Sequence, residues 1–267
     1  MKNILTAIII LFSAFVFIQC TEDEVTSTEN GTLKLEFDNV VGTSNLQLNT
    51  SNFAFENALG EDFKVTWLSY YISEVRLKKE DGTYFVDPVA FDGSKGFYLI
   101  DEADAESHVI ELKDVPPGSY TEVTFKIGVD ASQMTQGAQT GPLDLSIGLF
   151  WSWNSGYIFF AMEGASPVST AEGNALVYHV GGYKTLDGSP NLVNNIKEIT
   201  LTFNGDNPIV NADEDPQVHI IMDLKKFFNG PAGNISFASN SMRHSPASCV
   251  DVAQNMAAAF NVDHIHQ

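Results

Sequence analysis

Histidines close to sulfur-containing or aromatic residues are the side chains best suited to metal chemistry in this sequence. His179 lies in "VYHVGG" and His219 in "QVHIIMDL", and both stretches alternate like strands. "SMRHSPASC" puts His244 near a thioether and a thiol, and "VDHIHQ" ends the sequence with His264 and His266. Imidazole, thioether and thiol form a soft ligand set suited to Cu(I). His179, His244, His219 and His264 are therefore candidate metal ligands, although each position also fits an ordinary core or surface histidine.

Aromatic residues are concentrated in "GLFWSWNSGYIFFAMEG", residues 148–164. If this segment is one strand, Trp151, Trp153 and Tyr157 lie on one face, and the opposite face is largely apolar as well. A central strand buried on both faces is one interpretation. Stacking on sugar rings and long-range oxidation of an indole near a haem are two others. Trp67, in the aromatic stretch "TWLSYY", is a further candidate whose simplest role is in the core.

The N-terminus predicts export and attachment to a membrane. Residues 1–19 carry one lysine and then an apolar run shorter than the about 20 residues of a transmembrane helix, which is typical of a signal peptide. The run ends at Cys20, and this junction resembles a bacterial lipobox, so we expect a lipidated Cys20 anchored in a lipid bilayer. Residues 20–30 are acidic and polar, as in a flexible tether. These features predict an outer-membrane lipoprotein of the cell envelope, facing the periplasm or the exterior.

Composition and missing motifs exclude several classes of function. The formal net charge is -20, and lysine plus arginine total only 14, so the chain lacks the basic face that nucleic acid requires. The chain has two cysteines, and lipidation of Cys20 would leave Cys249 without a partner for an intramolecular disulfide. The sequence contains no GxSxG, HExxH, Walker or CxxC motif. We therefore expect a protein that is not an enzyme.

The elements that must position these residues are mostly strands. "GTLKLEFDNVVG", "GSYTEVTFKIGVD" and "NIKEITLTFNG" alternate between apolar and polar residues, and turns with glycine or proline separate such stretches. Near the end, "SPASCVDVAQNMAAAF" predicts a helix with Ser245 as its N-cap and Pro246 in its first position. The pattern predicts a single all-β domain over residues 31–267. We expect an antiparallel β-sandwich of about ten strands, Greek-key or immunoglobulin-like, with a short C-terminal helix.

The order of the aromatic and glycine motifs resembles that of a known family. "LSYYISEVRL" comes first, followed by "GSYTEVTFKIGVD", then the aromatic segment "FWSWNSGYIFFAMEG", and finally "YHVGG". In this order they resemble the MbnP-like family, the methanobactin-associated copper-binding proteins of the periplasm, many of them lipoproteins. The resemblance covers most of the chain, from about residue 31 to about residue 265.

This resemblance implies a secreted all-β protein that binds copper through histidine. In the family, a tryptophan can be oxidised to kynurenine by a partner enzyme, a dihaem cytochrome c peroxidase-like protein. Trp153, ahead of Trp151 and Trp67, would be the modified tryptophan or an aromatic wall behind the copper ligands. This protein would then be the substrate of the partner enzyme. The alternative function is a surface module that binds glycans or another envelope protein through exposed aromatic rings.

Overall fold

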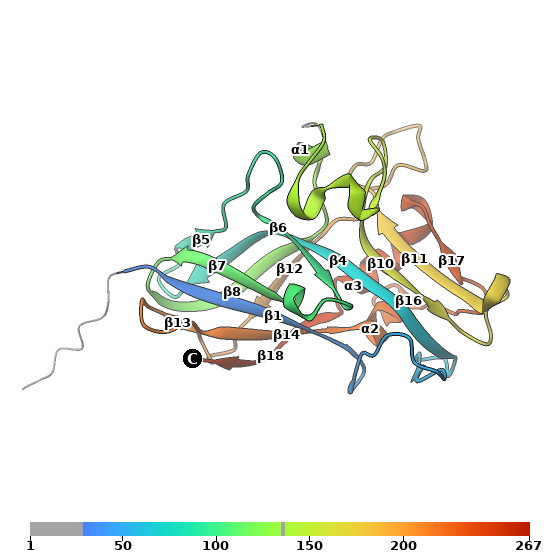
Figure 1. Cartoon of the computed structure of the whole chain (residues 1–267), viewed down its shortest axis with the longest axis horizontal. Coiled ribbons are helices and arrows are strands. Elements are labelled where there is room, and N and C mark those ends of the chain that lie inside the picture. The colour runs from blue at the N-terminus through green and yellow to red at the C-terminus, as the bar shows by residue number, and fades with distance from the viewer. Residues whose placement is uncertain (1–28, 135–136) are drawn as a thin grey trace, which may run out of the picture.

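The computed structural model describes residues 29–134 and 137–267, which form two large β-sheets (Figure 1). The predicted signal peptide, the lipidation site Cys20 and most of the tether lie outside the described residues. Within the described ranges, no helix has the length and apolar character needed to cross a membrane.

The smaller sheet has five strands in the order β18-β14-β1-β2, with β7 also paired to β1. These strands are β1 (Gly31–Val41), β2 (Ser44–Asn45), β7 (Val109–Val115), β14 (Gln217–Asp223) and β18 (Phe260–His266). The alternation predicted for β1 is confirmed, because Leu33, Leu35 and Phe37 are fully buried while the residues between them are half-buried.

The larger sheet has eleven strands, with the central order β12-β8-β4-β10-β11-β17. Its main strands are β4 (Asp62–Lys79), β6 (Phe97–Asp101), β8 (Gly118–Ile127), β10 (Gly156–Ala165), β11 (Ala175–Gly181) and β12 (Lys197–Thr202). Short strands complete it: β3 (Phe55–Glu56), β5 (Tyr84–Val86), β9 (Phe150–Ser152), β13 (Ile209–Val210) and β17 (Met242–Arg243). A separate hairpin joins β15 (Asn229–Gly230) to β16 (Gly233–Asn234).

Helices are few and short. The α-helices are α1 (Ala131–Met134), α2 (Leu224–Phe228) and α3 (Val250–Met256). Five 3₁₀ helices lie in the described residues, at Ala105–His108, Gly141–Leu143, Leu145–Ile147, Glu172–Asn174 and Pro246–Cys249. The predicted C-terminal helix is present and begins after Ser245, which forms a capping box with Ser248. It ends earlier than predicted, and Phe260 begins β18 instead of closing the helix.

The sheets are mixed, which corrects the prediction of a purely antiparallel sandwich. β1 pairs in parallel with β14, with Leu35 opposite Val218, and β11 pairs in parallel with β17. The strand patterns were recognisable because alternation is local, but the direction of each pairing depends on long connections that alternation does not encode. The predicted strand over the aromatic segment is also wrong. It is a hairpin of β9 and β10, and Gly156 enters β10 with a φ of 84° that favours glycine.

A core rich in aromatic rings lies between the two sheets. Phe37 of β1 packs edge-on against Tyr70 of β4, with ring centroids 6.3 Å apart. Tyr70 stacks on Phe160 of β10 at 5.7 Å, and Phe160 stacks on Phe227 of α2 at 4.6 Å. All four rings are fully buried. These stacked and edge-on rings join both sheets to α2 and hold β4, β10 and β11 in place. The opposite face of these three strands carries the candidate site.

Candidate metal centre

The outer face of β4, β10 and β11 positions the first candidate ligand. His179 on β11 pairs with Ala161 on β10, and Ala161 pairs with Ser69 on β4, so these side chains share a face. The neighbouring residues Tyr178 and Phe160 point into the core. Because residues 69 and 161 are small, the indole of Trp67 can lie against the imidazole of His179. The strand pattern therefore places His179 on one face of the sheet while its neighbours anchor the strand in the core on the other face.

The hydrogen bonds of His179 leave one ring nitrogen available. Its Nε2 donates to Oε1 of Glu163 over 2.9 Å. Its Nδ1 is buried and has no hydrogen-bond partner among the described residues. Only 8% of His179 is exposed. A buried nitrogen lone pair without a partner is unfavourable in a folded protein, and a bound metal ion would satisfy it.

The second histidine of the site comes from the segment after β17. The rings of His179 and His244 have centroids 4.6 Å apart. The segment is fixed on both sides of His244, by an ion pair between Arg243 and Asp251 at 3.1 Å and by the capping box that begins at Ser245. His244 is exposed, whereas His179 lies below it in the sheet. The pair could bind one metal ion at the protein surface.

Two tryptophans flank this pair of histidines. Trp151 donates from Nε1 to Nε2 of His244 over 3.2 Å, with ring centroids 5.5 Å apart. Trp67 lies edge-on to His179 at 5.8 Å and donates from Nε1 to the hydroxyl of Ser69. Trp153, the first choice from the sequence, is 47% exposed and packs on Phe150, at 5.0 Å between centroids. The geometry therefore places Trp151 and Trp67, and not Trp153, against the histidines.

Electrostatics keep His179 neutral. Burial lowers its pKa below the ordinary value, and the nearby His244 lowers it further, while Glu163 acts in the opposite direction. A neutral imidazole has a free lone pair and is the form that binds metal ions. His179 is therefore ready to accept a cation at neutral pH without first losing a proton.

Cys249 and Met242, which lie near His244 in the sequence, do not join the histidine pair. The thiol of Cys249 is buried and donates to the backbone carbonyl of His179 over 3.2 Å. Burial raises the pKa of this thiol, so it stays protonated. Met242 is 54% exposed on β17. Cys249 thus supports the backbone beneath His179, and the soft sulfur set expected from the sequence is not assembled.

Gly181 provides the space for the ring of Trp151. A Cβ atom at this position would lie 2.5 Å from Cζ3 of Trp151 and 2.5 Å from the carbonyl oxygen of Tyr157. We expect Gly181→Ala to displace Trp151 from His244, to lower the stability by about 1–3 kcal/mol and to weaken copper binding about tenfold. Thermal unfolding and copper titration would measure both effects.

Gly188→Ala is the matched control for Gly181→Ala. Gly188 has a φ of 78°, so alanine strains the backbone there, but a Cβ would meet no atom within 4 Å. This control should lower stability without changing the affinity for copper. Equal copper affinities for Gly181→Ala and the unmodified protein would show that Trp151 does not need its position for binding.

The other two predicted ligands lie elsewhere. His219 on β14 and His264 on β18 belong to the smaller sheet, where their rings stack at 4.2 Å. Figure 1 shows the C-terminal end of β18 well separated from β11 and β17. His266 joins them, with its ring 5.2 Å from that of His219. The four predicted ligands therefore form two pairs. The sequence signal for His266, which joins the second pair, was the "HIH" spacing at the C-terminus.

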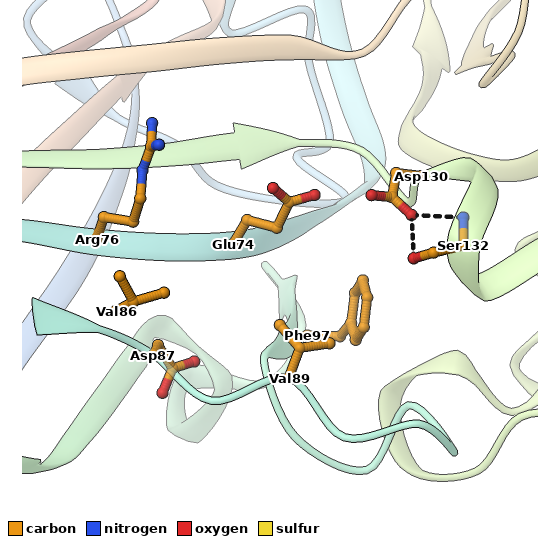
Figure 2. A pocket seen from close by; sticks show the side chains of 8 residues that line it. All are labelled: Glu74, Arg76, Val86, Asp87, Val89, Phe97, Asp130 and Ser132. Carbon is orange, nitrogen blue, oxygen red and sulfur yellow. Dashed lines mark hydrogen bonds between the residues drawn. The ribbon is translucent and has the colours of Figure 1, made fainter.

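A pocket beside β4 contains acidic residues instead of histidines (Figure 2). Glu74 lies near Asp130, which accepts hydrogen bonds from the backbone and hydroxyl of Ser132. Burial raises the pKa of Glu74. Burial also acts to raise the pKa of Asp130, but the hydrogen bonds from Ser132 and Glu74 together with the charge of Lys126 lower it overall. Lys126 forms an ion pair with Glu74. The acids and Lys126 form a network that holds the end of β8 to β4.

The fold and the site together define a mostly-β protein that holds two histidines between two indoles on the outer face of a sheet. The family model described as MbnP matches residues 30–251. The chain belongs to the MbnP family, which confirms the resemblance found in its motifs. No curated protein matches the chain.

The solved structure of MbnP from Methylosinus trichosporium shares the fold. It has 14% sequence identity to this chain and a TM-score of 0.52. The match covers 84% of this chain and 87% of that chain. At this identity the likeness concerns the arrangement of strands, so the function of this chain must be argued from its own residues.

Proposed function

We propose that this protein is a copper-binding lipoprotein of the cell envelope, and that His179 and His244 hold the copper ion. The observation that carries the proposal is the buried Nδ1 of His179, which has no hydrogen-bond partner among the described residues and belongs to a ring 4.6 Å from that of His244. Imidazole nitrogen is a preferred copper ligand. Membership of the MbnP family supports the choice of copper.

Glu163 and the indoles would tune the site. Glu163 accepts the Nε2 proton of His179, which fixes the tautomer and directs the Nδ1 lone pair away from the carboxylate. Trp67 and Trp151 exclude water from two sides of the pair. Copper, once bound, would supply a redox-active cation that this protein stores or delivers, and no residue of the site needs to turn over a substrate.

Trp151 is the tryptophan that we propose as the target of oxidation by a partner dihaem cytochrome c peroxidase-like enzyme. In the unoxidised protein, its Nε1–H donates a hydrogen bond to the lone pair of Nε2 on His244. Conversion to kynurenine opens the indole and turns this nitrogen into an aniline amine, which has a lone pair of its own. Oxidation would therefore change a competing donor into a group that can bind copper. Trp67, beside His179, is the second candidate, and Trp153 is the third.

Lipidation of Cys20 would place the site in the envelope. β1 begins at Gly31, directly after the acidic and polar stretch of residues 20–30, and this stretch would separate the anchor from the metal site. An acidic protein with a net charge of -20 also attracts cations, which favours capture of dilute copper.

The test is metal analysis together with peptide mass spectrometry on protein isolated from its native envelope. We expect about one equivalent of copper per chain for a single site. The peptide with Trp151 should be heavier by about 4 Da, because kynurenine gains one oxygen and loses one carbon. Replacement of Trp151 by phenylalanine should abolish this shift, while replacement of Trp153 should leave it. Metal-free, unmodified protein that takes up no supplied Cu(I) would contradict the proposal and direct attention to glycan binding.

A further inference from the structure

A second group of histidines lies on the outer face of the smaller sheet. His219 comes from β14, and His264 and His266 come from β18. Each offers a ring nitrogen, and these three nitrogens all lie within 4.8 Å of one another. The group shares no residue with the pair His179 and His244 and lies on the other sheet.

A β-bulge brings these side chains to one face. The register between β14 and β18 shifts at His219, which therefore lies opposite two residues, Asp263 and His264. In a regular strand, His264 would share the inner face with Val262, because the two have the same parity. The extra residue lets Val262 and Ile265 both pack against the core, and it leaves His264 exposed beside His219. Bulges often aim side chains at functional sites in this way.

Two aspartates orient two of the imidazoles. Oδ2 of Asp38 lies 3.0 Å from Nδ1 of His219, and Oδ2 of Asp263 lies 2.7 Å from Nδ1 of His264. When Nδ1 donates its proton to a carboxylate, the lone pair of the ring is on Nε2. Histidines that bind metal ions commonly donate their other N–H to a carboxylate in this way, which fixes the tautomer and makes the ligand more basic.

Two of the distances between the possible ligand atoms match those around one small cation. Nε2 of His264 is 3.2 Å from Nε2 of His266, and Nε2 of His219 is 3.5 Å from Oε2 of Glu36. Ligands about 2.0–2.1 Å from a tetrahedral Zn²⁺ lie about 3.3 Å from one another. These two distances match two edges of such a coordination tetrahedron, and Glu36 lies beside His219 because β1 pairs with β14 there.

We propose that this group is a second metal site, for a divalent cation of borderline softness such as Zn²⁺, with the ligands His219, His264, His266 and Glu36. Three imidazole nitrogens and one carboxylate oxygen are a ligand set that Zn²⁺ accepts readily. The side-chain amide of Gln217 lies 3.3 Å from Nε2 of His219 and also contacts Glu36, so it must move aside when the cation binds. This site is independent of the copper proposal, because it uses other ligands on another sheet.

The experiment is a calorimetric titration of Zn²⁺ into the intact, chelator-treated protein. The His179→Asn, His244→Asn double variant removes the first site, and it should still bind about one equivalent of Zn²⁺. On that background His264→Gln should weaken binding at least about tenfold, and Gln217→Ala should strengthen it because no amide then competes. His264 is exposed, so its replacement leaves the fold intact. Tetrahedral Co²⁺, followed by visible absorption, reports the geometry directly.

His108→Gln is the control for loss of a histidine in general. His108 borders the same surface hollow as Asp38 and Asp263 but belongs to neither candidate ligand group. This variant should bind Zn²⁺ as tightly as its parent. Absence of Zn²⁺ binding in the double variant would overturn the proposal. Unchanged affinity in both His264→Gln and His219→Gln would overturn it as well.

Discussion

Replacing His179 by asparagine should weaken binding of Cu(I) about 100-fold or more, measured by competition with a chelator of known affinity. His179 supplies the buried nitrogen without a hydrogen-bond partner among the described residues, and asparagine offers no imidazole in its place. The loss should exceed that of Glu163→Gln, which keeps the ligand but weakens its orientation and should cost about tenfold. Asparagine retains a polar group near Glu163, so the fold should survive the change.

Two controls separate loss of a ligand from loss of the fold. Thermal unfolding of His179→Asn should change little, since asparagine keeps a polar group near Glu163 and the strand is held by the buried Tyr178 and Val180 on its other side. His108→Asn removes a histidine that borders the surface hollow lined by Asp38 and Asp263, and copper affinity should not change. Equal affinities in His179→Asn and the unmodified protein would show that copper binds elsewhere or is not bound at all.

The parts of the fold that sequence predicts well are those set by neighbouring residues. Alternating apolar and polar residues marked β1 and β8, because a half-buried strand buries every second side chain. Ten strands in the described residues are five residues or longer, close to the number expected. The start of the C-terminal helix followed from Ser245 and Pro246, whose capping chemistry is also local.

The parts that were missed depend on contacts between distant residues. Glu36 lies beside His219 because β1 and β14, which are far apart in the sequence, pair in parallel. No local pattern specifies which strands pair or in which direction. Parity alone would place His264 on the face of Val262, and only the bulge reverses this. Trp153 was preferred from its motif, but it lies in the turn after β9 and packs on Phe150 instead of the histidines. Candidate ligands were therefore identifiable by residue type, and their grouping was not.

Replacing Phe160 by alanine should lower the free energy of unfolding by about 3–5 kcal/mol and the melting temperature by roughly 10 °C. Phe160 is fully buried and stacks on both Phe227 and Tyr70, so its loss opens a cavity where β4, β10 and α2 meet. Stacked rings on both sides are held by the packed core and cannot easily fill the space. Thermal and denaturant unfolding would measure the cost.

Phe91→Ala provides the matched control, because Phe91 is 72% exposed and should change stability by less than about 0.5 kcal/mol. The pair of variants also tests how the core supports the metal site. Phe160 and Ala161 are neighbours on β10, but one faces the core and the other faces His179. If β4, β10 and β11 only need to stay folded, the Cu(I) affinity of Phe160→Ala, measured below its melting temperature, should be within about threefold of that of the unmodified protein. A large loss of affinity in the folded variant would instead mean that stacking beneath the sheet sets the spacing of the two histidines above it.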